Sequence, residues 1–300
     1  MSITIDWLGV ATFRLRINDL VLFLDAYMDR VPTAPPVGMS ARDVDRADFV
    51  LVGHSHFDHV AGAEVIARNT GARIIGSLET CRLMREQSVP DEQLLPSQGG
   101  ERYRLSPDVT VRAFPSLHAC TWCAASIAFD EALSGFRGLT EDERAHAGGG
   151  LGTAIREAFR ADSDESRALR EHLTTATGSL HTGGPLVYLI ETPEATIFYQ
   201  DTTGGWTGVL RDVRADIAIL AASSRPNEDG EPFEGTLAHF IAQEAATLQA
   251  RKVVVGHHDD WMPPVTKPMP DIAPLRAELG RQAPAAALVE MGYLEGVRLA

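Results

Sequence analysis

The segment VLVGHSHFDHVAG, residues 50–62, constrains the fold of this chain more than any other. An apolar run of strand type reaches Gly53, and four potential metal ligands follow within six residues: His54, His56, Asp58 and His59. So many polar groups at the edge of a sheet would be costly to bury without a cation to compensate them. Neutral imidazole and carboxylate are the donors that zinc accepts where no thiolate is used. The segment therefore predicts a metal site directly after a buried strand.

Three other strand-like segments also run straight into a metal-competent side chain. VRAFPSL leads into His118, TIFYQ into Asp201, and KVVVG into His257. Loops at one edge of an α/β sheet gather side chains from distant parts of the sequence into one pocket. We therefore expect these residues to lie beside the histidine-rich segment.

Seven nitrogen and oxygen donors exceed what one tetrahedral ion can use, so we expect two divalent metal ions, zinc or, as the alternative, manganese. The expected ligands are His54, His56 and His118 for the first ion, Asp58, His59 and His257 for the second, and Asp201 as a bridge. Two metals about 3.5 to 4 Å apart can hold a shared hydroxide and polarise the group that it attacks. Asp58 can also orient the attacking water and pass a proton to the leaving group, so we expect it to be catalytic.

The rest of the pattern predicts one α/β domain over residues 1–300. Short apolar runs between residues 3 and 27 suggest an antiparallel meander, and two runs between 286 and 299 suggest a closing hairpin. Helical spacing is expected over 60–69, ending at a glycine. Strands followed by helices, with hairpins at both ends of the chain, indicate a sandwich of two mixed sheets covered by helices.

Between residues 119 and 184 the sequence has a different character, and we expect a helical insertion there. Thr140 and Glu143 have capping-box spacing, and a later helix is expected to begin at a cap, Asp164. Long segments beside a site often control access to it and its specificity. The insertion is therefore expected to form part of a wall or lid over the metal site.

The composition bears on partners and location. A formal net charge of -14 disfavours binding to nucleic acid and to an anionic membrane surface, both of which require Lys and Arg. No leader-type start and no apolar stretch of roughly 18 residues is present, which favours a cytoplasmic protein. A small-molecule substrate is the expected partner, and the sequence is compatible with a homo-oligomer.

The motifs resemble a known superfamily. HSHFDH matches the HxHxDH signature of the metallo-β-lactamase superfamily, and the three later ligands follow in that family's order. The opening WLGVATFRLRINDLVLFLD, which ends in Asp25, is similar to the subgroup that includes ascorbate-6-phosphate lactonase and N-acylphosphatidylethanolamine phospholipase D. HHDDW is similar to that subgroup's ending and favours His257 over His258 as the ligand. The resemblance implies an αββα fold and a dinuclear metal site.

Two departures from that family leave the substrate open. Val10 stands where relatives often have histidine, and the insertion after His118 lies outside the shared pattern. The favoured hypothesis is a hydrolase of a lactone or other carboxylic ester, or of a phosphodiester. The alternatives are an iron-containing redox or binding protein on the same fold and a structural metal protein without turnover. His56 favours hydrolysis, because iron-based electron-transfer relatives typically carry an acidic residue there.

Several residues are weaker candidates. His181, Trp261 and Lys267 are candidate substrate contacts, each with a surface or packing role as the alternative. Asp259 and Asp260 can accept hydrogen bonds from a ligand imidazole or face solvent. Cys120 and Cys123 form a CTWC motif, but no second cysteine pair and no βαβ context accompany it, so we interpret them as packed free thiols.

Overall fold

Three antiparallel strands form at the start of the chain, because apolar residues alternate or run continuously in three segments separated by tight turns. They are β1 (Ile3–Trp7), β2 (Phe13–Ile17) and β3 (Leu20–Leu24). Asn18 supplies the left-handed conformation, φ 51°, that the turn between the second and third strands requires. The expected meander is confirmed in this computed structural model, which describes residues 2–123, 128–147 and 150–300.

The meander belongs to the first of two seven-stranded sheets, which has the order β17-β1-β2-β3-β4-β5-β6. Its other strands are β4 (Phe49–Leu51), β5 (Arg73–Ser77), β6 (Leu94–Ser97) and β17 (Val297–Arg298). The strands from β3 to β6 are parallel, and the side chains of β4 are buried on both faces. A parallel strand covered on both sides explains the continuous apolar run before His54.

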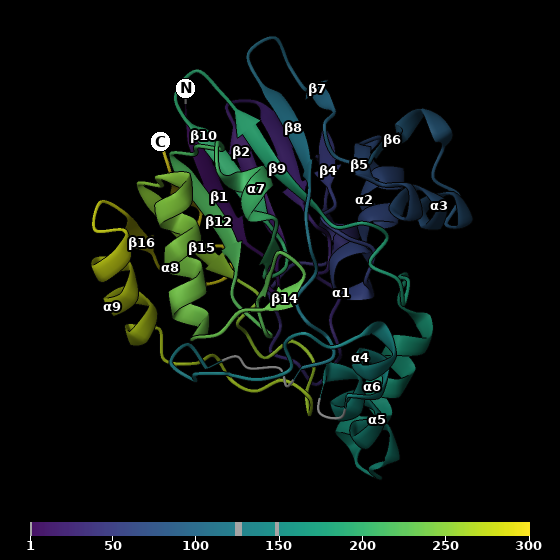
Figure 1. Cartoon of the computed structure of the whole chain (residues 1–300). Coiled ribbons are helices and arrows are strands. Elements are labelled where there is room, and N and C mark those ends of the chain that lie inside the picture. Colours follow the sequence, from purple (N-terminus) through teal and green to yellow (C-terminus); the bar gives the residue numbers. More distant parts are fainter. Residues whose placement is uncertain (1, 124–127, 148–149) are drawn as a thin grey trace.

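The second sheet has the order β16-β15-β12-β10-β9-β8-β7 and faces the first one (Figure 1). Its strands are β7 (Arg102–Arg104), β8 (Thr110–Pro115), β9 (Leu186–Glu191), β10 (Thr196–Gln200), β12 (Ile217–Ala221), β15 (Lys252–Gly256) and β16 (Ala287–Val289). A small third sheet joins β11 (Gly204–Gly205), β13 (Asn227–Glu228) and β14 (Glu231–Pro232).

Helices cover the outer face of each sheet. The helical elements are η1 (Ala41–Asp43), α1 (Phe57–Val60), α2 (Ala63–Thr70), α3 (Leu78–Glu86), η2 (Asp91–Gln93), α4 (Glu141–His146), α5 (Leu151–Arg160), α6 (Asp164–Thr175), α7 (Thr207–Leu210), α8 (Leu237–Leu248) and α9 (Ala273–Gln282). Helices α2 and α3 pack on the first sheet, and α8 and α9 pack on the second (Figure 1). The layers confirm the expected αββα sandwich.

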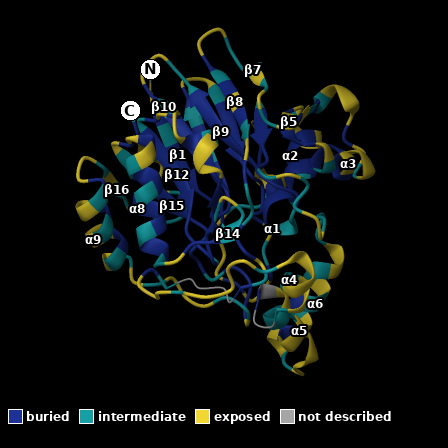
Figure 2. Cartoon of the chain, viewed as in Figure 1, coloured by how far each residue is buried: buried dark blue, intermediate teal, exposed yellow. Residues whose placement is uncertain are grey.

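Three apolar clusters hold these layers together. The one between the sheets includes Leu15, Tyr188, Tyr199 and Ile219, all buried. A second cluster lies between the first sheet and its helices, and a third lies between the second sheet and its helices, so the central strands are largely buried (Figure 2). Burial of apolar surface is the main stabilising contribution to such a sandwich, at about 25 cal/mol per Å². The result is a rigid frame whose strand ends can hold functional side chains in place.

The expected closing hairpin is wrong. Strand β16 instead lies parallel to β15, with Lys252 opposite Ala287, while β17 lies antiparallel to β1, with Thr4 opposite Arg298. The last segment therefore adds one strand to the edge of each sheet. Alternating apolar residues predict a strand, but they do not identify its partner, and two unpaired sheet edges competed here with the local turn.

Two helix boundaries also differ from expectation. The helix expected over 60–69 begins at Ala63 instead, as α2, because Gly62 interrupts it after the short helix α1. Gly62 has a φ of 110°, and a Cβ there would lie 2.4 Å from the Ala26 carbonyl oxygen. Helix α6 is capped by Ser163, which accepts from the amide of Ser166, rather than by the neighbouring aspartate. The expected capping box of α4 is present.

The segment 119–184 contains α4, α5 and α6, which lie together at one end of the sandwich near α1 and are largely exposed on their outer sides (Figures 1 and 2). Ala158 of α5 and Leu169 of α6 pack with Tyr27, Trp261 and Met262, a further buried cluster. This segment is thus fastened to the frame by its own apolar contacts.

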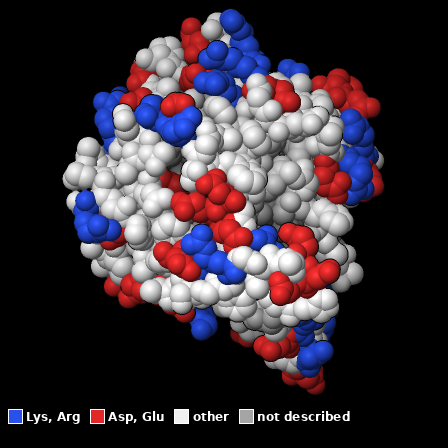
Figure 3. All heavy atoms as spheres, in the orientation of Figure 1, with Lys and Arg blue, Asp and Glu red and all other residues white. Residues whose placement is uncertain are grey.

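The surface is mixed in charge. On the face drawn in Figure 3, acidic and basic side chains are interspersed, with acidic groups gathered in its lower half. Within the described part of the chain, no helix combines the length and the apolar character needed to cross a membrane.

Candidate metal centre

Four strands of the sandwich end at one edge, and each is followed by ligand-type side chains. His54 and His56 follow β4, and α1 places the next two ligands on its first turn. His118 follows β8, Asp201 follows β10 directly, and His257 follows β15 directly. The structure thus brings together all seven residues expected from the sequence, in three overlapping groups whose ligand atoms lie within 4.8 Å of one another.

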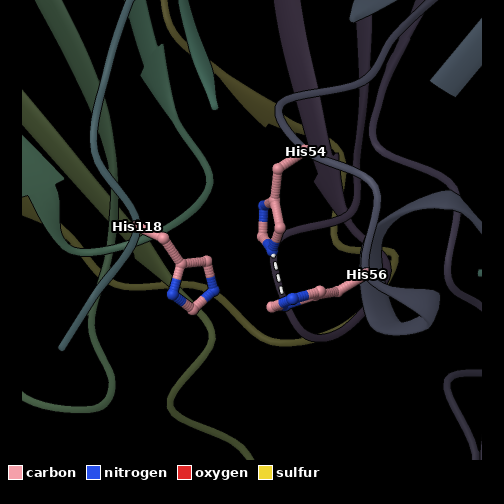
Figure 4. Close-up of side chains that lie close together, drawn as sticks. All are labelled: His54, His56 and His118. Carbon is pink, nitrogen blue, oxygen red and sulfur yellow. Dashed lines mark hydrogen bonds between the residues drawn. The ribbon is translucent and has the colours of Figure 1, made fainter. Parts of the chain in front are cut away.

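The first group is His54, His56 and His118 (Figure 4). Nε2 of His54 lies 3.1 Å from Nδ1 of His56, and the His118 ring centroid is 4.7 Å from each of the other two. Nδ1 of His118 donates to the carbonyl oxygen of Ala119 at 2.8 Å. This contact fixes the tautomer and leaves Nε2 of His118 free to accept a cation.

The second group is Asp58, His59 and His257. Oδ2 of Asp58 lies 3.4 Å from Nε2 of His59 and 3.4 Å from Nε2 of His257. The other nitrogen of each ring has its own partner: Nδ1 of His59 is 2.6 Å from Asp25, and Nδ1 of His257 is 3.1 Å from the Ser223 hydroxyl. Both imidazoles therefore present Nε2 toward the Asp58 carboxylate.

Asp201 contacts one histidine of each group. Its Oδ2 lies 2.6 Å from Nδ1 of His54 and 3.4 Å from Nδ1 of His59. Its Oδ1 is buried and has no hydrogen-bond partner among the described residues. The carboxylate reaches this place because residue 53 is glycine, where a Cβ would lie 2.1 Å from the Asp201 carboxyl carbon. An orphaned carboxylate oxygen is the group that a bound cation would satisfy.

Burial determines the charge of the first group. It lowers the pKa of His54 well below the usual range and the pKa of His56 and of His118 to about 3, with neighbouring histidines adding to the effect. These rings are neutral near pH 7 and keep a lone pair for a cation. Burial also lowers the pKa of His59, but Asp58, Asp25 and Asp201 outweigh it, so the net shift is upward.

The donor set fits divalent cations. Five imidazoles are packed together with three carboxylates, on Asp25, Asp58 and Asp201, and most of these side chains are buried. Carboxylates crowded in this way repel one another unless positive charge lies between them. The two three-residue groups offer separate places for two cations, with Asp201 touching a member of each.

A cavity of about 410 Å³ opens over the centre. Its floor includes His56, Asp58, His59, His118 and His257, and its walls include Phe57, Ile155, Leu180, Trp261, Met262 and Val265. Of the three candidate substrate residues, Trp261 and Lys267 line this cavity. His181 is exposed and lies outside the lining, where its backbone amide donates to Ser179.

Two hydrogen-bond partners of the ligand histidines were not predicted from the sequence, and Asp259 and Asp260, which were considered as partners of a ligand imidazole, have other partners. Asp25 and Ser223 hold the second-group imidazoles, while the carboxylate of Asp259 binds the backbone of Val10 and that of Asp260 accepts from the Thr266 hydroxyl. A signal for the missed pair existed, because Asp25 directly follows β3 and Ser223 follows β12 by two residues, as ligands follow other strands. His258 stacks on Trp7 instead of joining the cluster.

Comparison with known proteins agrees with this geometry. The model of the Beta-lactamase superfamily domain matches residues 21–159. Over 122 residues the chain is 30% identical to a UPF0173 metal-dependent hydrolase of Pyrobaculum neutrophilum, an alignment covering 41% of this chain and 53% of that protein. The chain therefore spans about half the length of the curated relatives it matches.

Solved structures share the whole fold. Igni18, a metallo hydrolase from the archaeon Ignicoccus hospitalis, superposes with a TM-score of 0.62 at 14% identity, covering 100% of this chain and 99% of that one. CmlA, a diiron β-hydroxylase from Streptomyces venezuelae, gives a TM-score of 0.55 at 13% identity, covering 99% of this chain and 54% of that one. Residues 21–159 thus match the Beta-lactamase superfamily domain, and the two-sheet fold of the whole chain is similar to that of these solved metallo hydrolase and hydroxylase structures.

Proposed function

We propose that this protein is a metal-dependent hydrolase that acts on a small carboxylic ester or lactone carrying an apolar group. The observation that carries the proposal is the convergence of seven donors from four strand ends, with Asp201 Oδ1 left without a partner. Two cations, most simply zinc, would supply a Lewis acid and lower the pKa of a water molecule at this site.

The side chains of the centre have separate tasks in this proposal. His54, His56 and His118 would hold the first cation, His59 and His257 would hold the second with Asp58, and Asp201 would contribute to both sites. Of the two acidic ligands, Asp58 is the one that lines the cavity, and its carboxylate is buried between the imidazoles of His59 and His257. It can therefore accept a proton from the attacking water and return it to the leaving group.

The cavity walls favour an apolar substrate. Phe57, Trp261 and Met262 present a continuous apolar surface beside Asp58. Among the described lining residues, Lys267 is the only lysine or arginine. A phosphodiester brings charge that such sites usually meet with several cationic side chains, so the lining supports an ester or lactone instead.

Lys267 would receive an anionic group on the far end of that substrate. It is exposed, and the loop before it is braced by the Thr266 hydroxyl, which donates to Asp260 at 2.7 Å and accepts from the Met262 amide at 2.7 Å. Helix α5 contributes Ile155 to the lining of the same cavity. The segment 119–184 would thus act as a wall of the substrate site.

Metal content and turnover test the proposal together. Purified protein should hold about two metal equivalents, hydrolyse members of an ester and lactone panel, and lose turnover after chelation until zinc is restored. Asp58→Ala and His56→Ala should abolish turnover and lower bound metal. His146→Ala, which removes an exposed histidine of α4, is the control and should change neither.

The same preparation distinguishes the competing function. CmlA is a diiron enzyme on this fold, so iron with visible absorption and redox activity would support a redox role instead. A colourless zinc protein that cleaves only phosphodiesters would support the proposed hydrolase activity and contradict the proposed ester or lactone substrate. Full turnover in metal-free protein would refute the whole proposal.

A further inference from the structure

The backbone of Val10 touches the backbone of a ligand residue. The Val10 carbonyl oxygen accepts from the amide of His257 at 2.6 Å and from Nε1 of Trp7 at 2.9 Å. His257 has a φ of 66° and Val10 a φ of 49°, the left-handed region that residues with a Cβ seldom adopt. Such conformations persist only where surrounding contacts hold them.

The other end of the Val10 peptide is held by Asp259. The two carboxylate oxygens of Asp259 lie 3.1 and 3.3 Å from the Val10 amide nitrogen, and the side chain is 1% exposed. The same carboxylate binds the guanidinium of Arg30 and accepts from the Tyr293 hydroxyl at 2.7 Å. The three side chains of Asp259, Arg30 and Tyr293 together form the Val10 clamp.

The contacts close a small ring. Asp259 accepts from the Val10 amide, the Val10 carbonyl accepts from the His257 amide, and only one residue separates His257 from Asp259 in the chain. Two glycines allow the loops to meet: a Cβ on Gly256 would lie 2.7 Å from the Val10 oxygen, and one on Gly9 would lie 3.2 Å from Oδ2 of Asp259.

We propose that the Val10 clamp is a positioning device for the second cation: it keeps His257 in its left-handed conformation so that the imidazole faces Asp58. This inference rests on the proposed function, since it takes His257 as a ligand. The clamp acts through backbone atoms of Val10, so it does not depend on the side chain at that position. Without Asp259, His257 is expected to relax, and Nε2 would leave its place 3.4 Å from Asp58.

The experiment measures metal affinity at each site. Metal-free wild type and Asp259→Asn are titrated with zinc against a chromophoric chelator, and bound zinc is counted by elemental analysis. Asp259→Asn is expected to keep the first equivalent and to bind the second at least tenfold more weakly, because partners that orient metal ligands typically contribute 10- to 100-fold. His257→Ala is expected to show the same pattern more strongly.

The neighbouring acid provides the matched control. Asp260→Asn removes one negative charge from the same loop, but this carboxylate accepts from Thr266 and, in the described part of the chain, makes no hydrogen bond to Val10. It is expected to bind both equivalents as wild type does. An equal loss in both variants would mean that loop charge, and not the clamp, sets the affinity, which would overturn the inference.

A milder variant covers the case in which Asp259→Asn does not fold. Tyr293→Phe removes the hydroxyl that donates to Asp259 at 2.7 Å and accepts from Arg30 at 3.3 Å, and it leaves the ion pair of Asp259 with Arg30. This variant should selectively weaken the binding of the second zinc equivalent, by a smaller factor than Asp259→Asn does. If folded Asp259→Asn binds two zinc equivalents as tightly as wild type, the inference is refuted and the proposed hydrolase function is unaffected. If Asp259→Asn does not fold, the same result in Tyr293→Phe has the same meaning. Wild type that binds no metal would instead remove the proposed function.

Discussion

The hydroxyl of Tyr27 lies 2.8 Å from Nε2 of His172, and this contact joins the end of the first sheet's meander to helix α6. The Tyr27 ring is buried and meets Phe57 and Trp261 edge-on, with centroids 5.6 and 6.0 Å away. Both of those aromatic residues line the cavity over the metal centre. The helical segment is therefore attached to the cavity wall by a polar contact as well as by apolar packing.

Tyr27→Phe should loosen α6 without removing the aromatic wall. Only the hydroxyl is lost, which leaves Nε2 of His172 without this partner and should cost about 1 kcal/mol. We expect faster backbone hydrogen exchange over Asp164–Thr175 and a higher KM with little change in kcat. Tyr103→Phe, which removes a hydroxyl bonded to the Pro96 carbonyl on the exposed surface, is the control. Unchanged exchange in α6 would show that apolar contacts alone hold it.

Gly53→Ala should damage the metal centre by adding one methyl group. A Cβ there would lie 2.1 Å from the Asp201 carboxyl carbon, so the carboxylate must move away from His54. We expect less bound metal and at least a tenfold loss of turnover. Gly208→Ala is the comparison, because a Cβ at that position has no atom within 4 Å. Equal metal content in both variants would contradict the tight contact between Gly53 and Asp201.

The sequence predicted the ligand cluster because ligand type and position are both local signals. His118, Asp201 and His257 each follow a strand of the second sheet. Strands β10, β12 and β15 are parallel, and β8 runs in the same direction because β9 lies antiparallel between it and β10, so all four strands end at one edge. The partners of the rings were missed, because whether Asp25 or Ser223 meets an imidazole depends on how the rings turn. Asp25 and Ser223 follow strands as the ligands do, which predicts their place at this edge, but the orientation of the rings is fixed by packing, which the strand pattern does not report.

The pairing of the last strands was mispredicted for a related reason. Residues 287–289 and 297–298 have strand character, but their partners, β15 and β1, are more than 30 residues away or at the other end of the chain. Periodicity reports which face of a strand is buried and says nothing about its neighbour. The fold class was still predictable, because it depends on the order of elements and not on the pairing of two edge strands.

The CTWC thiols should be inert in the folded protein. Cys120 and Cys123 are each 1% exposed, and burial raises the pKa of Cys120 to about 12 and raises that of Cys123. Burial also raises the pKa of Cys81 to about 11. Thiolate is the reactive form, so a disulfide reagent at pH 8 should label none of the three cysteines until denaturant is added. Rapid labelling of native protein would revive a redox role for the motif.

Glu244 should make the protein less stable as the pH rises. Its carboxyl group is buried in α8, accepts from Nε2 of Gln200 at 2.9 Å, and has no partner for Oε2 among the described residues. Burial raises its pKa from 4.5 to about 8, although the Gln200 contact lowers it. Between these two values the folded protein keeps a proton that the unfolded chain releases, so the free energy of unfolding falls as pH increases through this window.

Glu244→Gln keeps the shape of the side chain and removes the titration. Near pH 4.5 the titration of Glu244 should make little difference between the free energies of unfolding of the two proteins. From there to about pH 8 the free energy of unfolding of the variant should rise relative to that of wild type by on the order of 1 kcal/mol per pH unit. Urea unfolding at pH 5 and pH 8, with the same zinc concentration in every sample, measures the difference. Glu92→Gln, which removes an exposed carboxyl group, is the control and should follow wild type at both pH values. A gap between Glu244→Gln and wild type that stays constant with pH would mean that Glu244 is ionised in the folded protein.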